Sequence, residues 1–250
     1  IIADKILIPK ENQKFFSEKI IYLPNTYQPN DFTKKISKKI FKREEVGLPK
    51  DSFVFCCFCQ NYKITPNIFD IWMKVLKKIE GSVLWLIKDS NEGVKNLKKE
   101  AEKRGVNPDK IIFAENMPIS EHLARHKMAD LFIDTFPCNA HTTCSDALWS
   151  GLPVITLMGQ SFASRVSGSL LNAVDLNELI TTTEKDYEDL IINVAKDSKK
   201  LKIIKNKLKN NRITQPLFNT KLYTNKIESA YKKIYEKYHS DLPLENIEIK

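Results

Sequence analysis

The feature that most constrains the fold is a regular alternation of apolar runs and helical patterns. Between residues 53 and 173 a strand pattern is followed by a helix pattern five times. The first run, 53–59, is continuously apolar, which is typical of a strand buried on both faces of a sheet. The alternation predicts an α/β fold, with a Rossmann-like parallel sheet and helices on both of its faces.

The apolar runs and their flanking residues predict where the elements lie. Strands are expected at 19–23, 53–59, 82–87, 110–114, 131–134 and 153–157. Helices are expected at 66–80, 91–104, 120–129, 143–150, 162–173, 184–196, 198–210 and 219–239. Thr65, Ser120 and Thr143 are predicted as N-caps, the last in a capping box with Asp146. The basic stretch 34–43 fits either a surface helix or a linker.

Composition excludes several classes of protein. With 42% hydrophobic residues the chain is not disordered, and no run approaches ~18 uncharged apolar residues, as a membrane span requires. The net charge is +9, but all except five of the 40 basic residues are Lys and they are spread along the chain. With no recognition motif, this pattern argues against a nucleic-acid partner. Five Cys without a framework spacing indicate a reducing compartment, so a cytoplasmic location is expected.

In a sheet of this kind, ligands bind beyond the carboxyl ends of the strands. The loop after 53–59 contains Gln60 and Lys63. An ammonium just past a strand end can contact a phosphate, although a solvated Lys is the simpler interpretation. The loop after 110–114 leads to His122 and Arg125, which three-residue spacing places on one helix face. His122 fits a base, a stacking ring or a surface residue.

The loop after 131–134 is the most informative, because it runs from a strand end to a helix start rich in hydroxyl groups. His141, Thr142 and Thr143 lie there, where main-chain N–H groups and the helix dipole favour an anion such as phosphate. Neither a Walker A motif nor G-x-G-x-x-G is present. Cys56 and Cys59 have C-x-x-C spacing inside a strand, which favours buried packing over redox chemistry. The four His show no metal-site spacing.

Several longer motifs resemble one family. The chain is similar to the catalytic region of the O-linked N-acetylglucosamine transferases of glycosyltransferase family 41, including bacterial tetratricopeptide-fused members and Spindly-type relatives. The resemblance covers about residues 1–240. The segments that carry it are YLPNTYQPND at 22–31, FCQNYKI at 58–64, SVLWL at 82–86, CNAHTT at 138–143, LWSGLPV at 148–154, ASRV at 163–166 and PLFNT at 216–220.

The resemblance implies a two-lobed GT-B glycosyltransferase, of which this chain is the C-terminal, nucleotide-sugar-binding lobe. Residues 1–45 would be the end of the N-terminal lobe and the interlobe linker, 46–218 the nucleotide-sugar-binding lobe, and 219–250 a C-terminal helix and tail. The implied reaction is an inverting, metal-independent transfer of N-acetylglucosamine or a related sugar from a UDP-sugar to Ser or Thr hydroxyls. No cofactor is implied.

The implied partners are the UDP-sugar donor, an acceptor protein, the missing N-terminal lobe and upstream tetratricopeptide repeats, with neither nucleic acid nor membrane. The isolated chain is expected to be inactive. Two alternatives stay open: a GDP-fucose donor, as in Spindly-type members, and a nucleotide-binding module without activity. Ile119 stands where the animal enzymes have a Lys near the ribose, which leaves the donor sugar open.

The resemblance also implies a role for each candidate residue. Lys63 and His141 are the implied catalytic residues. The implied nucleotide-sugar site consists of Gln60 and Lys63 on the diphosphate, His141, Thr142 and Thr143 at the helix N-terminus, Asp146 on the ribose, and His122, Arg125 and the main chain of Met117 around the base.

Overall fold

The computed structural model describes all 250 residues, and its centre is a six-stranded sheet. Neighbouring strands are parallel throughout, in the order β5-β4-β3-β6-β7-β8. The strands are β3 (Val54–Cys57), β4 (Val83–Ile87), β5 (Ile111–Ala114), β6 (Leu131–Ile133), β7 (Val154–Leu157) and β8 (Ile180–Thr181). The predicted Rossmann-like sheet is confirmed, and all four residues of β3 are buried as expected.

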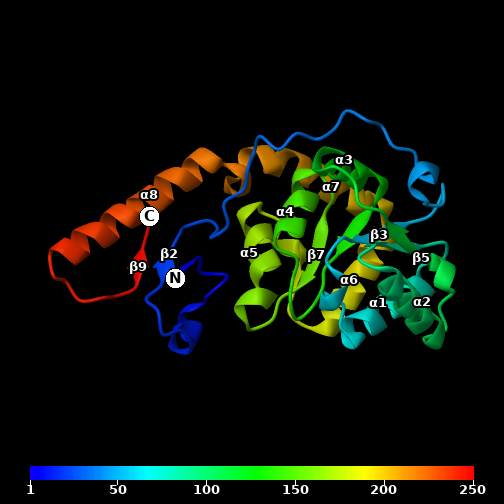
Figure 1. Cartoon of the computed structure of the whole chain (residues 1–250), viewed down its shortest axis with the longest axis horizontal. Helices are drawn as coiled ribbons and strands as arrows, with labels where there is room; N and C mark the ends of the chain where they lie inside the picture. The colour runs from blue at the N-terminus through cyan, green and yellow to red at the C-terminus, as the bar shows by residue number, and fades with distance from the viewer.

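Helices cover both faces of this sheet. The helices are α1 (Pro66–Lys78), α2 (Asn91–Lys103), α3 (Ile119–Arg125), α4 (Thr142–Trp149), α5 (Val166–Ala173), α6 (Glu184–Lys196), α7 (Ser198–Thr214) and α8 (Thr220–His239). α1 packs against α6 on one face, and α4 packs against both α3 and α5 on the other (Figure 1). No helix combines the length and the apolar character that crossing a membrane requires.

A second, small parallel sheet joins the two ends of the chain. It consists of β1 (Ile2–Ala3), β2 (Ile21–Tyr22) and β9 (Ile247–Glu248), so both termini lie together, beside α8 (Figure 1). Residues 34–43 form no helix and cross the molecule as a linker, one of the two predicted possibilities. The predicted division at residues 45 and 218 stays a prediction.

Local capping signals placed two helix starts wrongly. α3 begins at Ile119 with Pro118 before it, so Ser120 is not its N-cap. α4 begins at Thr142, which makes His141 the N-cap residue in place of Thr143. Thr65 does precede α1 as predicted, but its hydroxyl caps no helix N–H and instead donates to the carbonyl of Phe136, 2.9 Å away.

Candidate functional site

The two strands at the centre of the sheet define where a ligand can bind. β3 and β6 are neighbours, and the chain proceeds from them toward opposite edges, through β4 and β5 or through β7 and β8. A crevice opens at the carboxyl ends of strands at such a switch point. Lys63 Nζ crosses from the loop after β3 and donates to the carbonyl of Asn139, 2.9 Å away in the loop after β6. The structure therefore brings the first and third predicted loops together.

A buried carboxylate holds the loop after β6. Asp134 Oδ1 accepts hydrogen bonds from the main-chain N–H groups of Thr135 (2.8 Å) and Ala140 (2.7 Å), and Oδ2 accepts one from Thr156 Oγ1 (2.7 Å). Burial raises the pKa of Asp134 to about 6, against the lowering effect of these hydrogen bonds. The two main-chain contacts fix both ends of the loop that leads to α4.

The N-terminus of α4 presents unpaired donors. No side chain caps it, and the main-chain N–H groups of Thr142 and Thr143 have no acceptor within the chain. The predicted capping box is wrong, because Thr143 is the second helical residue and its hydroxyl lies 3.5 Å from Cys59 Sγ. Free N–H groups at a helix start are the feature that an anion needs.

Two further groups of the predicted set lie beside this helix start. His141 is half buried, and its Nε2 is inaccessible to solvent and has no hydrogen-bond partner. Burial, followed by the positive charge of Lys63, lowers the pKa of the His141 imidazole. Gln60 is exposed and precedes the 3-10 turn Asn61–Lys63. The His141 imidazole, the Lys63 ammonium and the free N–H groups thus gather around the loop between β6 and α4.

His122 and Arg125 contact each other, as their spacing predicts. Arg125 Nη2 lies 2.6 Å from His122 Nδ1, and Nη1 donates to the carbonyl of Glu115, 2.5 Å away. The guanidinium also stacks on Phe58, 4.7 Å from the ring centroid, and Arg125 is only 1% exposed. Arg125 therefore orients His122 and has little surface to offer a ligand.

The contact with Arg125 fixes the chemistry of the His122 ring. Since a guanidinium only donates, Nδ1 accepts, and the neutral imidazole carries its proton on Nε2. Burial, then the neighbouring His126 and Arg125, lower the pKa of His122 to about 3, so the ring is neutral at physiological pH. Met117 is half buried in the loop directly before α3. This part of the site offers an N–H donor and an aromatic face.

Several residues that sequence reasoning missed support the predicted ones. Phe58 packs on His122 with ring centroids 5.1 Å apart, and the fully buried His126 donates from Nδ1 to the carbonyl of His122, 2.8 Å away. The sequence did contain a usable signal for Asp134, described above, because a carboxylate directly after an apolar strand indicates a specific role at the strand end. His126 gave none, because a His in a helical pattern fits a surface position equally well.

Asp146 is engaged by a residue outside the predicted set. Its carboxylate Oδ1 lies 2.6 Å from Lys34 Nζ, and the two side chains are 9% and 31% exposed. The predicted contact of Asp146 with a ribose stays a prediction. Among the lysines of the chain, nothing in the sequence distinguishes Lys34.

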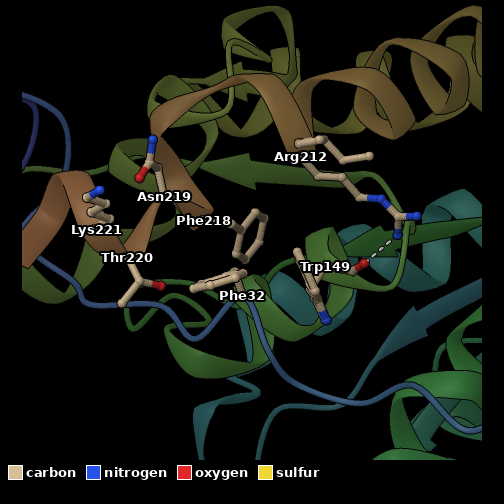
Figure 2. A pocket seen from close by; sticks show the side chains of 8 residues that line it. Phe32, Trp149, Arg212, Phe218, Asn219, Thr220 and Lys221 are labelled. Atoms are coloured by element: carbon tan, nitrogen blue, oxygen red, sulfur yellow. Dashed lines mark hydrogen bonds between the residues drawn. The ribbon is translucent and has the colours of Figure 1, made fainter.

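One cavity lies away from these residues. It has a volume of about 250 Å³, and Figure 2 shows the rings of Phe32, Trp149 and Phe218 gathered around it near the C-terminal end of α4. Arg212 donates to the carbonyl of Trp149 at its rim (2.6 Å). No predicted site residue lines it. No group of three or more acidic, His or Cys side chains is arranged to hold a metal ion.

Comparison with known proteins places the chain among glycosyltransferases. The model of glycosyl transferase family 41 matches residues 30–227. The probable UDP-N-acetylglucosamine–peptide N-acetylglucosaminyltransferase SEC of Arabidopsis thaliana is 36% identical over 241 residues, which are 94% of this chain and 25% of that protein. The UDP-N-acetylglucosamine–peptide N-acetylglucosaminyltransferase of Caenorhabditis elegans is 35% identical over 205 residues, 82% of this chain and 18% of that protein. The chain thus spans a quarter or less of the length of these relatives.

Solved structures agree with this placement. A variant of the O-GlcNAc transferase of Thermobaculum terrenum matches 94% of this chain and 44% of its own chain, with a TM-score of 0.84 and 26% sequence identity. The sucrose-phosphate synthase of Thermosynechococcus elongatus matches 94% of this chain and 58% of its own, with a TM-score of 0.66 and 12% identity. The second likeness is one of fold alone.

Proposed function

The chain belongs to glycosyltransferase family 41, and on this premise we propose that it is the nucleotide-sugar-binding lobe of a protein O-glycosyltransferase. The proposed reaction transfers N-acetylglucosamine, or a related sugar, from a UDP-sugar to a Ser or Thr hydroxyl of an acceptor protein, with inversion at the anomeric carbon. Two similar proteins are named as UDP-N-acetylglucosamine–peptide transferases, which supports this donor and this kind of acceptor.

The observation that carries the proposal is the position of Lys63 next to the start of α4. Transfer from a nucleotide-sugar releases a diphosphate, whose negative charge grows as the sugar departs. Lys63 Nζ sits on the loop that ends at the free N–H groups of Thr142 and Thr143, so a cation and helix-terminal donors can act on the same group. Removing one such preorganised donor typically costs ~10²–10³ in rate.

The remaining site residues take complementary roles in this proposal. His141 supplies a neutral imidazole beside the diphosphate, and Gln60 a side-chain amide at the rim. Asp146 accepts a hydrogen bond from the ribose. His122 offers its face and its Nε2–H to the base, with Arg125 behind it and the main chain of Met117 at the edge. All of these residues lie within this chain, so the proposed site can recognise the nucleotide without the second lobe.

The surface of α8 supports the proposal that an N-terminal lobe completes the protein. Of its 20 residues only Ala230 is buried. Tyr231, Tyr235 and Tyr238 are 57%, 65% and 76% exposed, and their spacing places them along one side of the helix. Figure 1 shows α8 extending beyond the main sheet. A stripe of exposed aromatic side chains on a projecting helix fits a surface that another lobe covers.

Features outside this chain stay expectations. Upstream tetratricopeptide repeats fit the greater length of the relatives. A cytoplasmic location fits the five unpaired Cys, three of which are buried in or beside β3. A bacterial source is likewise an expectation, which comes from the resemblance to bacterial tetratricopeptide-fused members.

Calorimetric titration with UDP and GDP tests the proposal. The parent chain should bind UDP more tightly than GDP, and Lys63→Met should weaken UDP binding at least tenfold. The matched control is Lys110→Met, because Lys110 Nζ also donates to a main-chain carbonyl, that of Leu76 (3.2 Å), but at the amino end of β5. UDP affinity unchanged by Lys63→Met would overturn the assigned site, and a preference for GDP would favour a fucosyl-type donor. The chain alone should show no transfer, and detectable turnover would contradict the need for a second lobe.

A further inference from the structure

The linker contributes a charged side chain to the proposed donor site. We propose that Lys34 is a further donor-binding residue, whose ammonium holds Asp146 and contacts the phosphate side of the nucleotide-sugar. This inference rests on the proposed function, because it assigns a new residue to the same site.

Lys34 and Asp146 form an ion pair. Lys34 Nζ lies 2.6 Å from Asp146 Oδ1, and the Asp146 side chain is only 9% exposed. Asp146 lies four residues after Thr142 and three after Thr143 on α4, so it shares their helix face. One helical turn, about 5 Å along the axis, separates it from the free N–H groups at the helix start. The ammonium of Lys34 is therefore held next to the proposed diphosphate site.

The start of the linker is fixed in place beside α4. Trp149 Nε1 donates to the carbonyl of Lys34, 3.0 Å away, and Gln28 Nε2 donates to Ser145 Oγ, 2.6 Å away. Figure 2 shows Phe32, two residues before Lys34, beside the Trp149 ring, with which it lines one cavity. Residues 28–34 thus contact both the middle and the end of α4.

Further along the chain, the linker lies against α3. The main-chain N–H of Ser37 donates to the carbonyl of Ser120, 2.9 Å away, and Lys39 pairs with Glu121 (2.8 Å). Ser120 and Glu121 directly precede His122, which is proposed to contact the base. Lys34 therefore enters the site between the helix assigned to the phosphates and the helix assigned to the base.

The ion pair engages only one carboxylate oxygen of Asp146. Asp146 Oδ2 accepts no hydrogen bond within the chain and reaches solvent, so it is free to accept one from a ribose hydroxyl. An unpaired carboxylate there would repel a diphosphate one helical turn away. Lys34 removes that repulsion and keeps two further N–H donors for a phosphate oxygen. The pair thus lets one site accept both a sugar hydroxyl and an anion.

The test compares Lys34→Met with a variant that loses an equivalent ion pair elsewhere. Lys78 lies 2.6 Å from Glu188, whose side chain is 12% exposed, and joins α1 to α6 on the face opposite α4. Lys78→Met therefore leaves a similarly buried carboxylate unpaired without touching the proposed site. Both Met variants should lower the urea midpoint by similar amounts.

Titration with UDP and with uridine separates binding from stability. Lys34→Met should weaken UDP binding at least tenfold and uridine binding much less, because the lost ammonium faces the phosphates. Lys34→Arg should stay within about threefold of the parent, and Lys78→Met should bind UDP like the parent. Equal UDP affinities of Lys34→Met and Lys78→Met would overturn the inference, as would equal losses for UDP and uridine.

The outcome with Lys63→Met distinguishes the two proposals. If Lys63→Met weakens UDP binding and Lys34→Met does not, the proposed function stands and the role of Lys34 is wrong. If neither variant changes UDP binding, or the parent binds no UDP, the assigned site itself is wrong and the role of Lys34 with it.

Discussion

The buried His126 should make the protein lose stability in mild acid. An unfolded His takes up a proton below pH ~6.5. In the folded chain burial lowers the pKa of His126 to about 4, because its charged form would be desolvated among apolar neighbours. Between these values the unfolded state binds more protons than the folded state, so the free energy of unfolding falls as the pH falls. The stability is fully present above pH ~6.5 and is lost as the pH approaches 4.

The size of the effect follows from the two pKa values. The interval from 6.5 to about 4, at ~1.4 kcal/mol per pH unit, gives about 3 kcal/mol for His126. His122, with a pKa lowered to about 3, acts in the same direction but is partly exposed, so solvent reduces its share. Asp134 acts in the opposite direction, because burial raises its pKa to about 6. Its burial costs stability in full above pH 6, and this cost is relieved as the pH falls toward the ordinary carboxyl value of 3.8.

Urea unfolding between pH 7 and 4.5 measures the effect when the parent is compared with His126→Gln. The Gln amide does not titrate but can still donate to the carbonyl of His122, which the imidazole does now at 2.8 Å. At pH 7 the variant should be within ~1.5 kcal/mol of the parent, the net value of one hydrogen bond. Toward pH 4.5 the parent should lose about 2 kcal/mol more than the variant. Because both proteins contain Asp134, its contribution cancels in the difference. Identical slopes for parent and variant would refute the reasoning.

Two further substitutions test the packing around the site loop. Gly159→Ala would place a Cβ 2.6 Å from Ser164 Oγ and 2.9 Å from Phe136 Cε2, so the free energy of unfolding should fall by ~1–3 kcal/mol. The midpoint of urea unfolding measures this loss, and an unchanged midpoint would show that Ser164 and Phe136 can move aside without cost. Tyr187→Phe removes the hydroxyl that donates to the buried carbonyl of Asp134 (2.7 Å), which should cost ~1–3 kcal/mol and lower the melting temperature by several degrees; a melting temperature equal to that of the parent would contradict this.

Apolar patterning predicted the fold because a strand buried on both faces of a parallel sheet needs consecutive apolar residues, which can be read directly from the sequence. Each of the four residues of β3 is buried, and the sequence there is apolar throughout. α6 occupies the predicted range, 184–196, since a capping Thr183 and an amphipathic pattern bound it at the start. Helix starts were less reliable. Ser120 was predicted as the N-cap of α3, but Pro118 holds that position. A hydroxyl caps a helix only where the main-chain conformation lets it reach a free N–H group of the first turn.

Interactions between residues close in sequence were also predictable. His122 and Arg125 contact each other at 2.6 Å, as a separation of three residues on a helix implies. The capping box of Thr143 and Asp146 failed under the same kind of reasoning. The capping box does not form because both side chains have other partners. Asp146 pairs with Lys34, which is 112 residues away in sequence, and Thr143 contacts Cys59 in the loop after β3. A local rule holds only where no distant partner competes for the same side chains.

Topology explains why the two halves of the site could be predicted and the linker could not. β3 and β6 each begin one half of the alternating strand–helix pattern, and they lie side by side at the centre of the sheet. Ligands of parallel sheets bind at the carboxyl ends of such strands, which places Lys63 and His141 at one site although the two strand starts are 77 residues apart. The linker follows no such pattern, and its charge is common along the chain. Its position depends on a few side-chain contacts, such as that of Trp149 with the carbonyl of Lys34. The charge balance around Asp146 is therefore set by tertiary packing, and substitutions that loosen the linker should disturb it even where they lie outside the donor site.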